Sequence, residues 1–276
     1  MIAVLGMGLL GSGMVEHALG RGEQVRVWNR TASKTAPLVA KGAIAAETPA
    51  DAVRGCDRVH LILAEDDAVD AVIDALRPGL GKDVLILDHS TNLPARVEAR
   101  VKTLHAEGVA YVHAPVFMAP SDARKASGMI VVGGDPSLAA RARPALAKMT
   151  GLVLDGGASP SGAAALKLCG NALFIGLAGL MGDVLAIGQG GGLTTEQTLA
   201  LFEHLKPSPG FVASRLAGAG TRPASFELTM ARKDVRLMLT TAGDGLVVLP
   251  GVAAAMDRAI DAGKGSADFG VFAKRG

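Results

Sequence analysis

The sequence has few aromatic residues, few cysteines and little net charge. Aromatic residues make up 3% of the 276 residues, and the formal net charge is +2. A nucleic-acid-binding protein typically has a basic face and rings that stack on bases, so this composition argues against one. The two cysteines, Cys56 and Cys169, lie in apolar segments without metal-ligand spacing. We therefore expect both to be reduced thiols of a cytoplasmic protein.

Motifs for metal, hydrolytic and membrane chemistry are also missing. The six histidines show no HExxH or paired spacing, and no GxSxG elbow joins a strand to a helix, so we expect neither a metal site nor a hydrolase. The first apolar run is too short for a signal peptide. The charge-free run 168–182 contains Asn171 and is shorter than the roughly 20 apolar residues of a membrane span. It predicts a buried helix and no membrane partner.

The start of the chain carries the strongest pattern. The apolar run Ile2–Leu5 leads into VLGMGLLGSG, and the apolar spacing that follows predicts a helix and then a second strand, Val25–Trp28. In a dinucleotide-binding βαβ unit the first glycine permits a tight turn, the second lets the backbone approach a pyrophosphate, and the third allows close packing of the helix. The predicted cofactor loop consists of Gly6, Met7, Gly8, Leu9, Leu10 and Gly11.

The residues after the second strand favour one cofactor. NAD-type units usually carry an Asp or Glu about 20 residues beyond the glycines, on the ribose 2′-hydroxyl. Asn29 stands there instead, followed by Arg30, Thr31 and Lys34. A carboxylate would repel a 2′-phosphate, whereas a guanidinium can bind one through two parallel hydrogen bonds. We predict a preference for NADP(H) over NAD(H), the alternative being that Arg30 and Lys34 only solvate a loop.

Apolar runs alternate with alanine-rich segments of helical length as far as residue 154. Further strands are predicted at residues 59–63, 84–87, 109–112, 130–132 and 152–154. This alternation is typical of a mostly parallel, helix-covered sheet. Beyond the segment GGASPSG only helical patterns follow, including 162–188, 195–204 and 226–241. We predict an α/β fold, with a Rossmann-type dinucleotide-binding domain over residues 1–158 and an all-helical domain over 159–276.

The second domain opens with the long apolar helix that joins the two domains. Such a helix should be buried on most sides. A second copy of the chain is one way to bury it, so we predict a homodimer or a higher homo-oligomer.

Six segments together resemble the β-hydroxyacid dehydrogenase family, which includes 3-hydroxyisobutyrate dehydrogenases and semialdehyde reductases. They are GMGLLGSGM, NRT, LDHSTNLP, APVFMAPSDARKASGMIVVGG, GAAALKLCGNAL and FELTMARKDVRLML, in the family's order and over nearly the whole chain. The resemblance implies an enzyme that transfers a hydride between NADP(H) and a small semialdehyde or β-hydroxy acid.

The resemblance also implies roles for individual polar residues. Lys167 matches the family's catalytic lysine, and Asn171 lies one helical turn later on the same face. A lysine ammonium can supply the proton that an alcohol gains on reduction and can stabilise developing alkoxide charge. Lys233 matches a second cation near cofactor and substrate, and Asp234 a carboxylate that holds the local structure. Without the family, a lone lysine in an apolar helix is more often a snorkelling residue.

Further cofactor contacts are implied after the third and fourth strands. Leu63 ends the third predicted strand and Ala64 follows it, and Ser90 and Thr91 match the family's segment beside the nicotinamide ribose. Ser90 and Thr91 could also cap the helix after Pro94, and the two roles can coexist.

The substrate loop departs from the family. Its usual pattern is Asp-Ala-Pro-Val-Ser-Gly-Gly, whereas this chain has Phe117, Met118 and Ala119 in place of Ser-Gly-Gly and His113 in place of the Asp. A ring and a thioether replace small groups that admit a carboxylate. We therefore expect a more apolar or bulkier substrate, or a carboxylate held elsewhere, as by Lys233. The predicted substrate site contains Phe117, Met118, Ala119, Lys167, Asn171 and Lys233. His113 is interpreted as a hydrogen-bonded packing residue.

Two other functions fit part of the pattern. An imine reductase has a similar fold but typically lacks the helix lysine, so Lys167 argues against it and the apolar Phe117 argues for it. A non-catalytic NADP(H)-sensing module is the alternative outside enzymes, because a fold alone does not establish activity. The N-terminal part is also similar to the NAD-binding domain of 6-phosphogluconate dehydrogenase. That activity is disfavoured because the chain is shorter than that family's and lacks a cluster of phosphate-binding cations.

Overall fold

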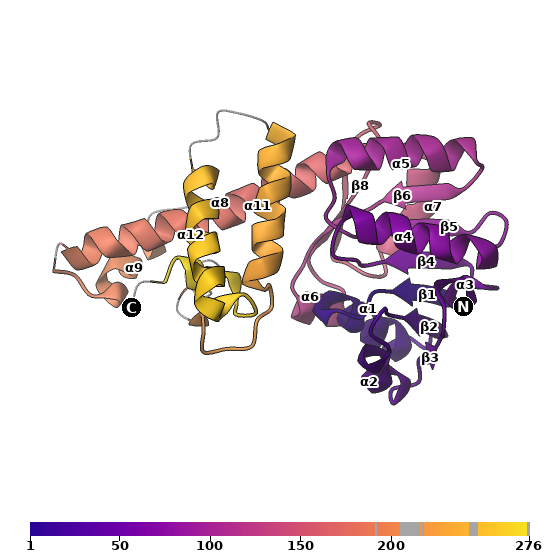
Figure 1. Ribbon diagram of the computed structural model, residues 1–276, viewed down its shortest axis with the longest axis horizontal. Coiled ribbons are helices and arrows are strands. Elements are labelled where there is room, and N and C mark those ends of the chain that lie inside the picture. Colours follow the sequence, from indigo (N-terminus) through magenta and orange to yellow (C-terminus); the bar gives the residue numbers. More distant parts are fainter. Residues whose placement is uncertain (191, 205–215, 217, 243–247, 275–276) are drawn as a thin grey trace. The chain divides into compact units, whose positions relative to one another are not determined.

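Short apolar runs of the first half of the chain form a six-stranded parallel sheet in the computed structural model (Figure 1). The spatial order is β3-β2-β1-β4-β5-β6. The strands are β1 (Ile2–Leu5), β2 (Val25–Trp28), β3 (Ile44–Ala45), β4 (Arg58–Leu61), β5 (Leu85–Asp88) and β6 (Ala110–His113). The order reverses between β1 and β4, and open α/β sheets bind their ligands beyond the carboxyl ends of the strands at such a switch point.

The structure describes residues 1–190, 192–204, 216, 218–242 and 248–274. The chain divides into two units, Met1–Lys167 and Leu168–Gly276. The predicted domain boundary, between residues 158 and 159, falls before this division, because the start of the long helix packs with the first unit. Ala164, for example, belongs to a core cluster of that unit.

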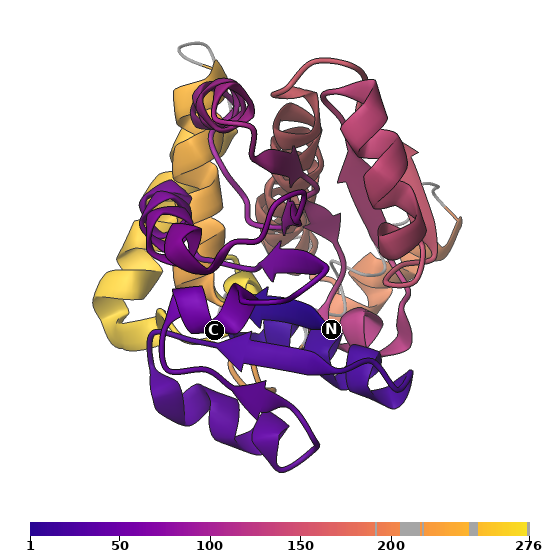
Figure 2. The ribbon, with the colours of Figure 1, turned by 90° about the vertical axis from the view of Figure 1, so that its right-hand side faces the viewer.

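Helices cover both faces of the six-stranded sheet (Figure 2). Ala3 and Leu5 of β1 pack with α3 (Pro49–Val53), α4 (Asp66–Leu76) and α5 (Pro94–Ala106). Ile2 and Val4, which point the other way, pack with α1 (Leu9–Gly20) and α2 (Ala36–Val39). Two buried faces explain why β1 consists entirely of apolar residues. Short 3-10 turns, η1 (Ala32–Thr35) and η2 (Arg77–Gly79), follow β2 and α4.

A second, three-stranded sheet completes the first unit. Its strands are β7 (Val116–Phe117), β8 (Met129–Val132) and β9 (Leu152–Asp155), with β7 antiparallel to β8. Helices α6 (Pro120–Lys125) and α7 (Pro136–Leu146) connect them. The predicted strands 130–132 and 152–154 therefore exist but form a separate sheet. The two-residue strands β3 and β7 were not predicted because they are too short for an alternating pattern.

The second unit is rich in helices. They are α8 (Gly162–Gly190), which starts in the first unit, α9 (Thr195–His204), α11 (Leu228–Ala242), α12 (Leu249–Ala259) and the short turns η3 (Ile260–Lys264) and η4 (Phe269–Phe272). By length and hydropathy alone, Gly162–Gly179 of α8 could cross a membrane, and 33% of this stretch is buried within the chain. Apolar side chains of α8 remain exposed, with Leu173 at 60%, so the described residues cover less of this helix than its sequence predicts.

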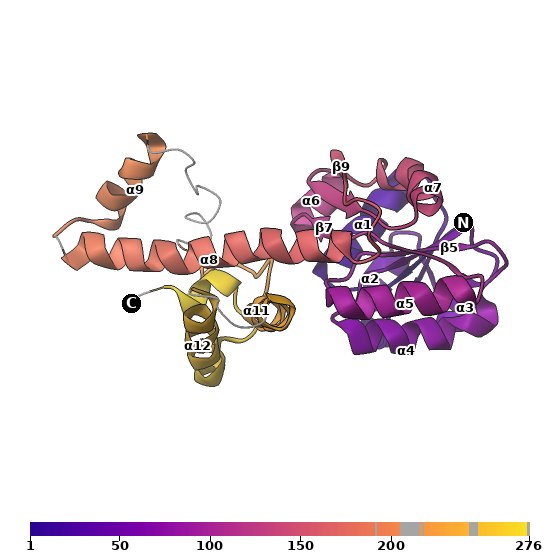
Figure 3. The same cartoon turned by 90° about the horizontal axis from the view of Figure 1, so that it is seen from above.

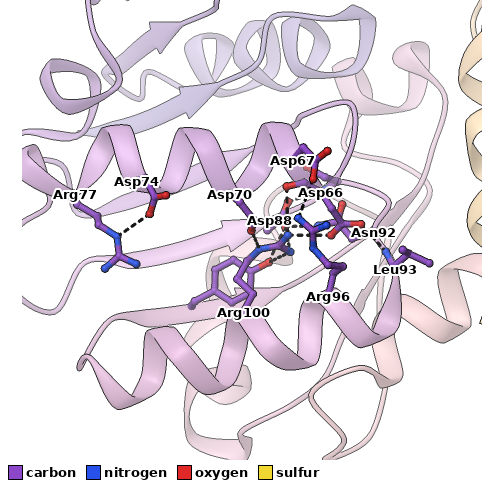
Figure 4. A network of polar contacts seen from close by, with 12 residues as sticks. Asp66, Asp67, Asp70, Asp74, Arg77, Asp88, Asn92, Leu93, Arg96 and Arg100 are labelled. Atoms are coloured by element: carbon purple, nitrogen blue, oxygen red, sulfur yellow. Dashed lines mark hydrogen bonds and ion pairs between the residues drawn. The ribbon is translucent and has the colours of Figure 1, made fainter.

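Arg100 joins α5 to α4, two helices that lie side by side (Figures 3 and 4). Its side chain is only 4% exposed, and its guanidinium lies 2.9 Å from an Asp66 oxygen and 2.6 Å from an Asp70 oxygen. A third carboxylate, that of Asp88 at the end of β5, lies 3.9 Å away. Buried charges require partners of opposite sign, so this arginine neutralises three carboxylates, two from α4 and one from β5.

Replacing Arg100 should therefore destabilise the first unit strongly. Arg100→Met keeps much of the apolar stem but leaves Asp66 and Asp88 buried without their cation, so we expect a loss of about 3–5 kcal/mol in the free energy of unfolding. The matched control is Arg96→Met, because Arg96 is 43% exposed and pairs with Asp67 and Asp70 at the surface. Its loss should be about 0–1 kcal/mol. Urea unfolding measures both, and equal losses would contradict the assignment.

Candidate functional site

The glycine loop after β1 has the geometry that its sequence demands. Gly6 has φ of +109°, and a Cβ built on it would lie 2.1 Å from the Ile62 carbonyl oxygen. A Cβ on Gly11 would lie 2.0 Å from the carbonyl oxygen of Gly6. Both positions therefore require glycine, the first for its backbone conformation and for space, the second for the close approach of α1 to the loop.

Gly8 differs from Gly6 and Gly11, the other two glycines of the loop. It is the N-cap of α1 with an extended backbone, and a Cβ built on it would meet nothing within 4 Å. The first amide groups of a helix have no partner inside the helix and attract anions. Open space over a helix N-terminus fits the pyrophosphate of a dinucleotide, with Leu9, Leu10 and Gly11 supplying the first helical amides.

Asn29 ties the end of β2 to the glycine loop. Its Oδ1 accepts a hydrogen bond from the Met7 amide at 2.9 Å, and its Nδ2 donates to the Thr31 carbonyl oxygen at 2.9 Å. The Met7 side chain is buried in the core. An amide does both tasks at once, whereas an ionised carboxylate could only accept. The residue in the usual carboxylate position thus acts on the loop that would cradle the cofactor.

Cations are exposed beyond Asn29. Arg30, Thr31 and Lys34 are all exposed, with Lys34 inside η1. In the described part of the chain neither Arg30 nor Lys34 has an ion-pair partner. Two solvated cations therefore stand shortly after the end of β2. On the other side of the loop, Leu63 lies against Gly6, and Ala64 is exposed.

Ser90 is held by backbone and carboxylate together. Its hydroxyl accepts a hydrogen bond from the Leu63 amide at 2.9 Å, and its own amide donates to Asp88 at 2.9 Å. The predicted segments 63–64 and 90–91 are therefore joined. The N-cap of α5 is Leu93, without a side-chain hydrogen bond, so neither Ser90 nor Thr91 is the N-cap residue.

Asp88 is a residue of this edge that the sequence interpretation missed. Its fully buried carboxylate accepts hydrogen bonds from the Tyr111 hydroxyl at 2.7 Å and from Asn92 Nδ2 at 3.1 Å, besides the Ser90 amide. Burial raises the pKa of Asp88, but His113, Arg100 and these donors outweigh it and hold the pKa below its usual range. A carboxylate that directly ends a buried apolar strand was the signal in the sequence.

His113, at the end of β6, is buried beside Asp88. Burial lowers its pKa to about 4, although the Asp88 carboxylate acts in the opposite direction. Neither ring nitrogen has a hydrogen-bond partner among the described residues. The prediction of a hydrogen-bonded packing histidine is therefore wrong in its first half: the ring packs, but its nitrogens are not paired.

Lys167 and Phe117 meet within the first unit. The Lys167 Nζ lies 4.5 Å from the centroid of the Phe117 ring, over its face. This is a cation–π contact, typically worth about 0.5–1 kcal/mol at an exposed site. Next to them, the Ala119 amide donates to the Asp122 carboxylate at 2.7 Å. That amide is therefore occupied by the protein itself, and Phe117 rather than a hydroxyl faces the lysine.

The remaining predicted residues form a cluster in the second unit. Asn171 Nδ2 donates to Asp234 Oδ2 at 2.5 Å, and Lys233 Nζ lies 2.7 Å from Asp234 Oδ1. The buried carboxylate of Asp234 thus links the two predicted site residues. No three His, Cys, Asp or Glu side chains in the described ranges come together as a metal site.

A parallel sheet with a glycine loop at its switch point, joined to a helix-rich unit, defines the class of dinucleotide-dependent oxidoreductases. The family of the NAD binding domain of 6-phosphogluconate dehydrogenase matches residues 1–157. The chain belongs to the β-hydroxyacid dehydrogenase family, as its motifs indicated.

Individual relatives agree with this assignment. The uncharacterized oxidoreductase YfjR of Bacillus subtilis is 31% identical over 87% of this chain and 86% of its own length. The 3-sulfolactaldehyde reductase of Escherichia coli is 26% identical over 97% and 93%. In fold, the chain resembles the 3-hydroxyisobutyrate dehydrogenase of Mycobacterium tuberculosis, with TM-score 0.85, 21% identity and coverage of 99% and 97%. It also resembles an imine reductase of Myxococcus stipitatus, with TM-score 0.68, 23% identity and coverage of 99% and 98%.

The glycine loop allows a matched test of cofactor binding. Gly8→Ala should leave the melting temperature unchanged, because its Cβ enters open space, yet weaken NADPH binding by about tenfold, since that space is where a pyrophosphate would approach. Gly11→Ala should instead lower the melting temperature of the cofactor-free protein, because its Cβ would overlap the Gly6 carbonyl. Thermal melts and NADPH titrations separate the two. Unimpaired NADPH binding by Gly8→Ala would contradict the proposed cradle.

The buried histidine makes stability depend on pH in a defined direction. His113 in the unfolded chain takes up a proton near its ordinary pKa of about 6.5, whereas the folded ring does so only at about pH 4. The stability that the neutral ring contributes is present above the pKa of the unfolded state and is lost as the pH falls toward the pKa of the folded state. The loss amounts to about 2 kcal/mol at pH 5. His113→Leu should lose that much less between pH 7 and pH 5 in urea unfolding. Equal losses in both proteins would contradict the assignment.

Proposed function

We propose that the protein is an NADP(H)-dependent reductase or dehydrogenase that transfers a hydride between NADP(H) and a small semialdehyde or β-hydroxy acid. The observation that carries the proposal is the Lys167 ammonium held over Phe117, the last residue of β7, which follows β6 after two residues. In parallel strands the loops after β1, β4, β5 and β6 emerge at one edge of the sheet. A proton donor therefore belongs to the same unit as the glycine loop.

The cofactor assignment rests on charge and space. Gly8 leaves room over the N-terminus of α1, and Arg30 and Lys34 are exposed beyond a neutral Asn29. These features favour the 2′-phosphate of NADP(H), with Arg30 as its main contact. Ser90, Thr91 and Leu63 would hold the nicotinamide ribose.

The protein's own part in reduction is to bind the carbonyl and to donate a proton. NADPH, when bound, supplies a hydride to the carbonyl carbon. Lys167 donates a proton from its ammonium group to the carbonyl oxygen, which becomes the hydroxyl of the product, and the neutral amine then regains a proton from water. Oxidation runs the same steps backwards. Asn171 and Lys233 would orient the substrate's polar groups, with Asp234 as their common anchor.

The divergent loop would select the substrate. Phe117 and Met118 present apolar surface, and the Ala119 amide is occupied by Asp122. A carboxylate therefore has fewer partners in this loop than the family pattern offers, which favours a more apolar substrate or a carboxylate bound by Lys233. The exposed apolar residues of α8, including Leu173 and Phe174, support a homodimer. A cytoplasmic location fits an enzyme of this class with two free cysteines.

An imine reductase is the second candidate. The apolar face of Phe117 and the fold similarity to imine reductases favour it, and Lys167 argues against it. A protein that binds NADP(H) without turnover is the third. We would follow NADPH absorbance with a panel of semialdehydes, keto acids and cyclic imines. The proposal predicts turnover of at least one semialdehyde. Turnover of imines alone would favour the second candidate, and tight NADPH binding without any turnover the third.

Lys167→Met tests the proton donor. The variant keeps the apolar stem, so we expect NADPH affinity to change little while turnover falls by about two orders of magnitude or more, the contribution of a positioned acid or base. Lys125→Met is a suitable control because Lys125 is an exposed residue of α6. Retention of most activity by Lys167→Met would refute the assigned role.

Arg30→Ala tests the cofactor preference. Only NADPH would lose a phosphate contact, and charge-assisted hydrogen bonds contribute roughly 1.5–3 kcal/mol. NADPH affinity should therefore fall by about tenfold or more, while NADH affinity stays nearly constant. Arg54→Ala, at an exposed arginine directly after α3, controls for the loss of one surface charge. Equal losses for the two cofactors would mean that Arg30 is only structural.

A further inference from the structure

Two buried histidines have no part in the chemistry described above. His60 on β4 is 1% exposed, and His89, directly after β5, is 2% exposed. Their rings are nearly parallel, at 14°, with centroids 5.3 Å apart. The sequence separates them by a whole helix and a strand, so the parallel pairing of β4 with β5 brings them together.

Arg58, beside His60, determines which nitrogen of each ring donates and which accepts. Arg58 Nε lies 3.1 Å from His60 Nε2, and the Arg58 guanidinium also pairs with Glu23 at 2.5 Å. An arginine can only donate, so His60 Nε2 must accept and carries no proton. The proton of His60 is therefore on Nδ1, which lies 2.9 Å from His89 Nε2.

The Ala114 carbonyl oxygen, beside His89, requires the same direction of donation. His89 Nε2 accepts from His60, so the proton of His89 is on Nδ1. That atom lies 2.7 Å from the Ala114 carbonyl oxygen, which can only accept. Because Arg58 can only donate and the Ala114 carbonyl oxygen can only accept, one placement of the two ring protons is possible. Both histidines are neutral and both carry their proton on Nδ1.

The electrostatic surroundings agree with two neutral rings. Burial, the neighbouring His89 and the cations Arg58 and Arg21 all lower the pKa of His60. Burial also lowers the pKa of His89, more than the Ala114 carbonyl and the Asp88 carboxylate raise it. Protonation of either ring would place a second donor against an existing one.

The hydrogen-bonded chain from Arg58 through His60 and His89, here called the relay, ends at Ala114, at the start of the substrate loop. The Ala114 carbonyl accepts from His89, and the Ala114 amide donates to the Asp88 carbonyl oxygen at 2.7 Å. Residues 88 and 89 thus hold both backbone polar groups of Ala114. The next residue, Ser90, is bonded to the Leu63 amide. Three residues after Ala114, the ring of Phe117 lies under the Lys167 ammonium.

We propose that His60 and His89 are positioning residues that hold residues 114–117, and with them Phe117 and Lys167, in register with the loops after β4 and β5. The proposal rests on the proposed function for the role of Lys167. The relay itself does not, and it can be measured without turnover.

The first experiment reads the relay directly. Long-range ¹H–¹⁵N spectra of the full chain, labelled in histidine and measured at pH 7, distinguish the two neutral tautomers and the imidazolium form. His60 and His89 should both be neutral with the proton on Nδ1, with the signals assigned through His60→Gln and His89→Gln. An imidazolium, or a proton on Nε2, at either residue would overturn the proposal whatever the enzyme's activity.

The second experiment compares two substitutions of similar size. The amide of His60→Gln can accept from Arg58 and donate to His89, whereas His60→Leu can do neither. We expect His60→Leu to lower kcat by about tenfold or more through misplacement of the reacting groups, with unchanged NADPH affinity. His60→Gln should stay within about threefold of the wild type. Equal losses in the two variants, or a loss confined to KM, would overturn the proposal.

A structural readout separates failure of the relay from failure of the proposed function. The nuclear Overhauser contact between the Phe117 ring and the Lys167 side chain should persist in His60→Gln and disappear in His60→Leu. Its persistence in a folded His60→Leu would refute the positioning role. Should the wild type turn over no carbonyl substrate, the proposed function fails, and the tautomers and this contact still decide the relay.

Discussion

The buried carboxylate of Asp88 is the contact on which the carboxyl edge of the sheet depends. It ends β5, receives hydrogen bonds from the Ser90 amide, the Asn92 side chain and the Tyr111 hydroxyl, and lies 3.9 Å from the Arg100 guanidinium. A buried carboxylate is tolerated only when such donors surround it. Arg100 therefore links α5 to α4 and β5, and the Ser90 amide ties its own loop to the end of β5. The Ala114 amide, bonded to the backbone of the same residue, extends this constraint to the substrate loop.

Two positions near the carboxyl edge of the sheet, Asn29 and Phe117, depart from the family's motifs. Asn29 stands where NAD-type units usually have a carboxylate, and its side chain accepts a hydrogen bond from the Met7 amide of the glycine loop. Phe117 replaces a small hydroxyl residue of the family pattern and covers the lysine with its ring face. Both changes replace a group that would contact a ligand with one that organises the protein. In the function that we propose, the ligand contacts would then come from Arg30 for the cofactor and from Lys167 for the substrate.

The sequence predicted what depends on local pattern. The glycine loop, the long strands and α8 follow from residues that are close together in the chain, and their ranges agree with the structure within a few residues. The strands β3 and β7 were missed because two residues carry no period. Asp88, the pair of His60 and His89, and the unpaired nitrogens of His113 depend on contacts between different strands, which a single sequence does not specify. The order of strands, which separates β8 and β9 into a second sheet, is likewise a tertiary property.

The central claim is that this chain transfers a hydride to a carbonyl carbon and a proton to the carbonyl oxygen. It is tested most directly with NADPH carrying deuterium at C4 of the nicotinamide and a small semialdehyde, followed by mass spectrometry of the product. The account predicts an alcohol with one deuterium on the carbinol carbon from one of the two C4 epimers of the cofactor, and none on oxygen after exchange. An unlabelled alcohol, or label that appears only in an amine formed from an added imine, would contradict it.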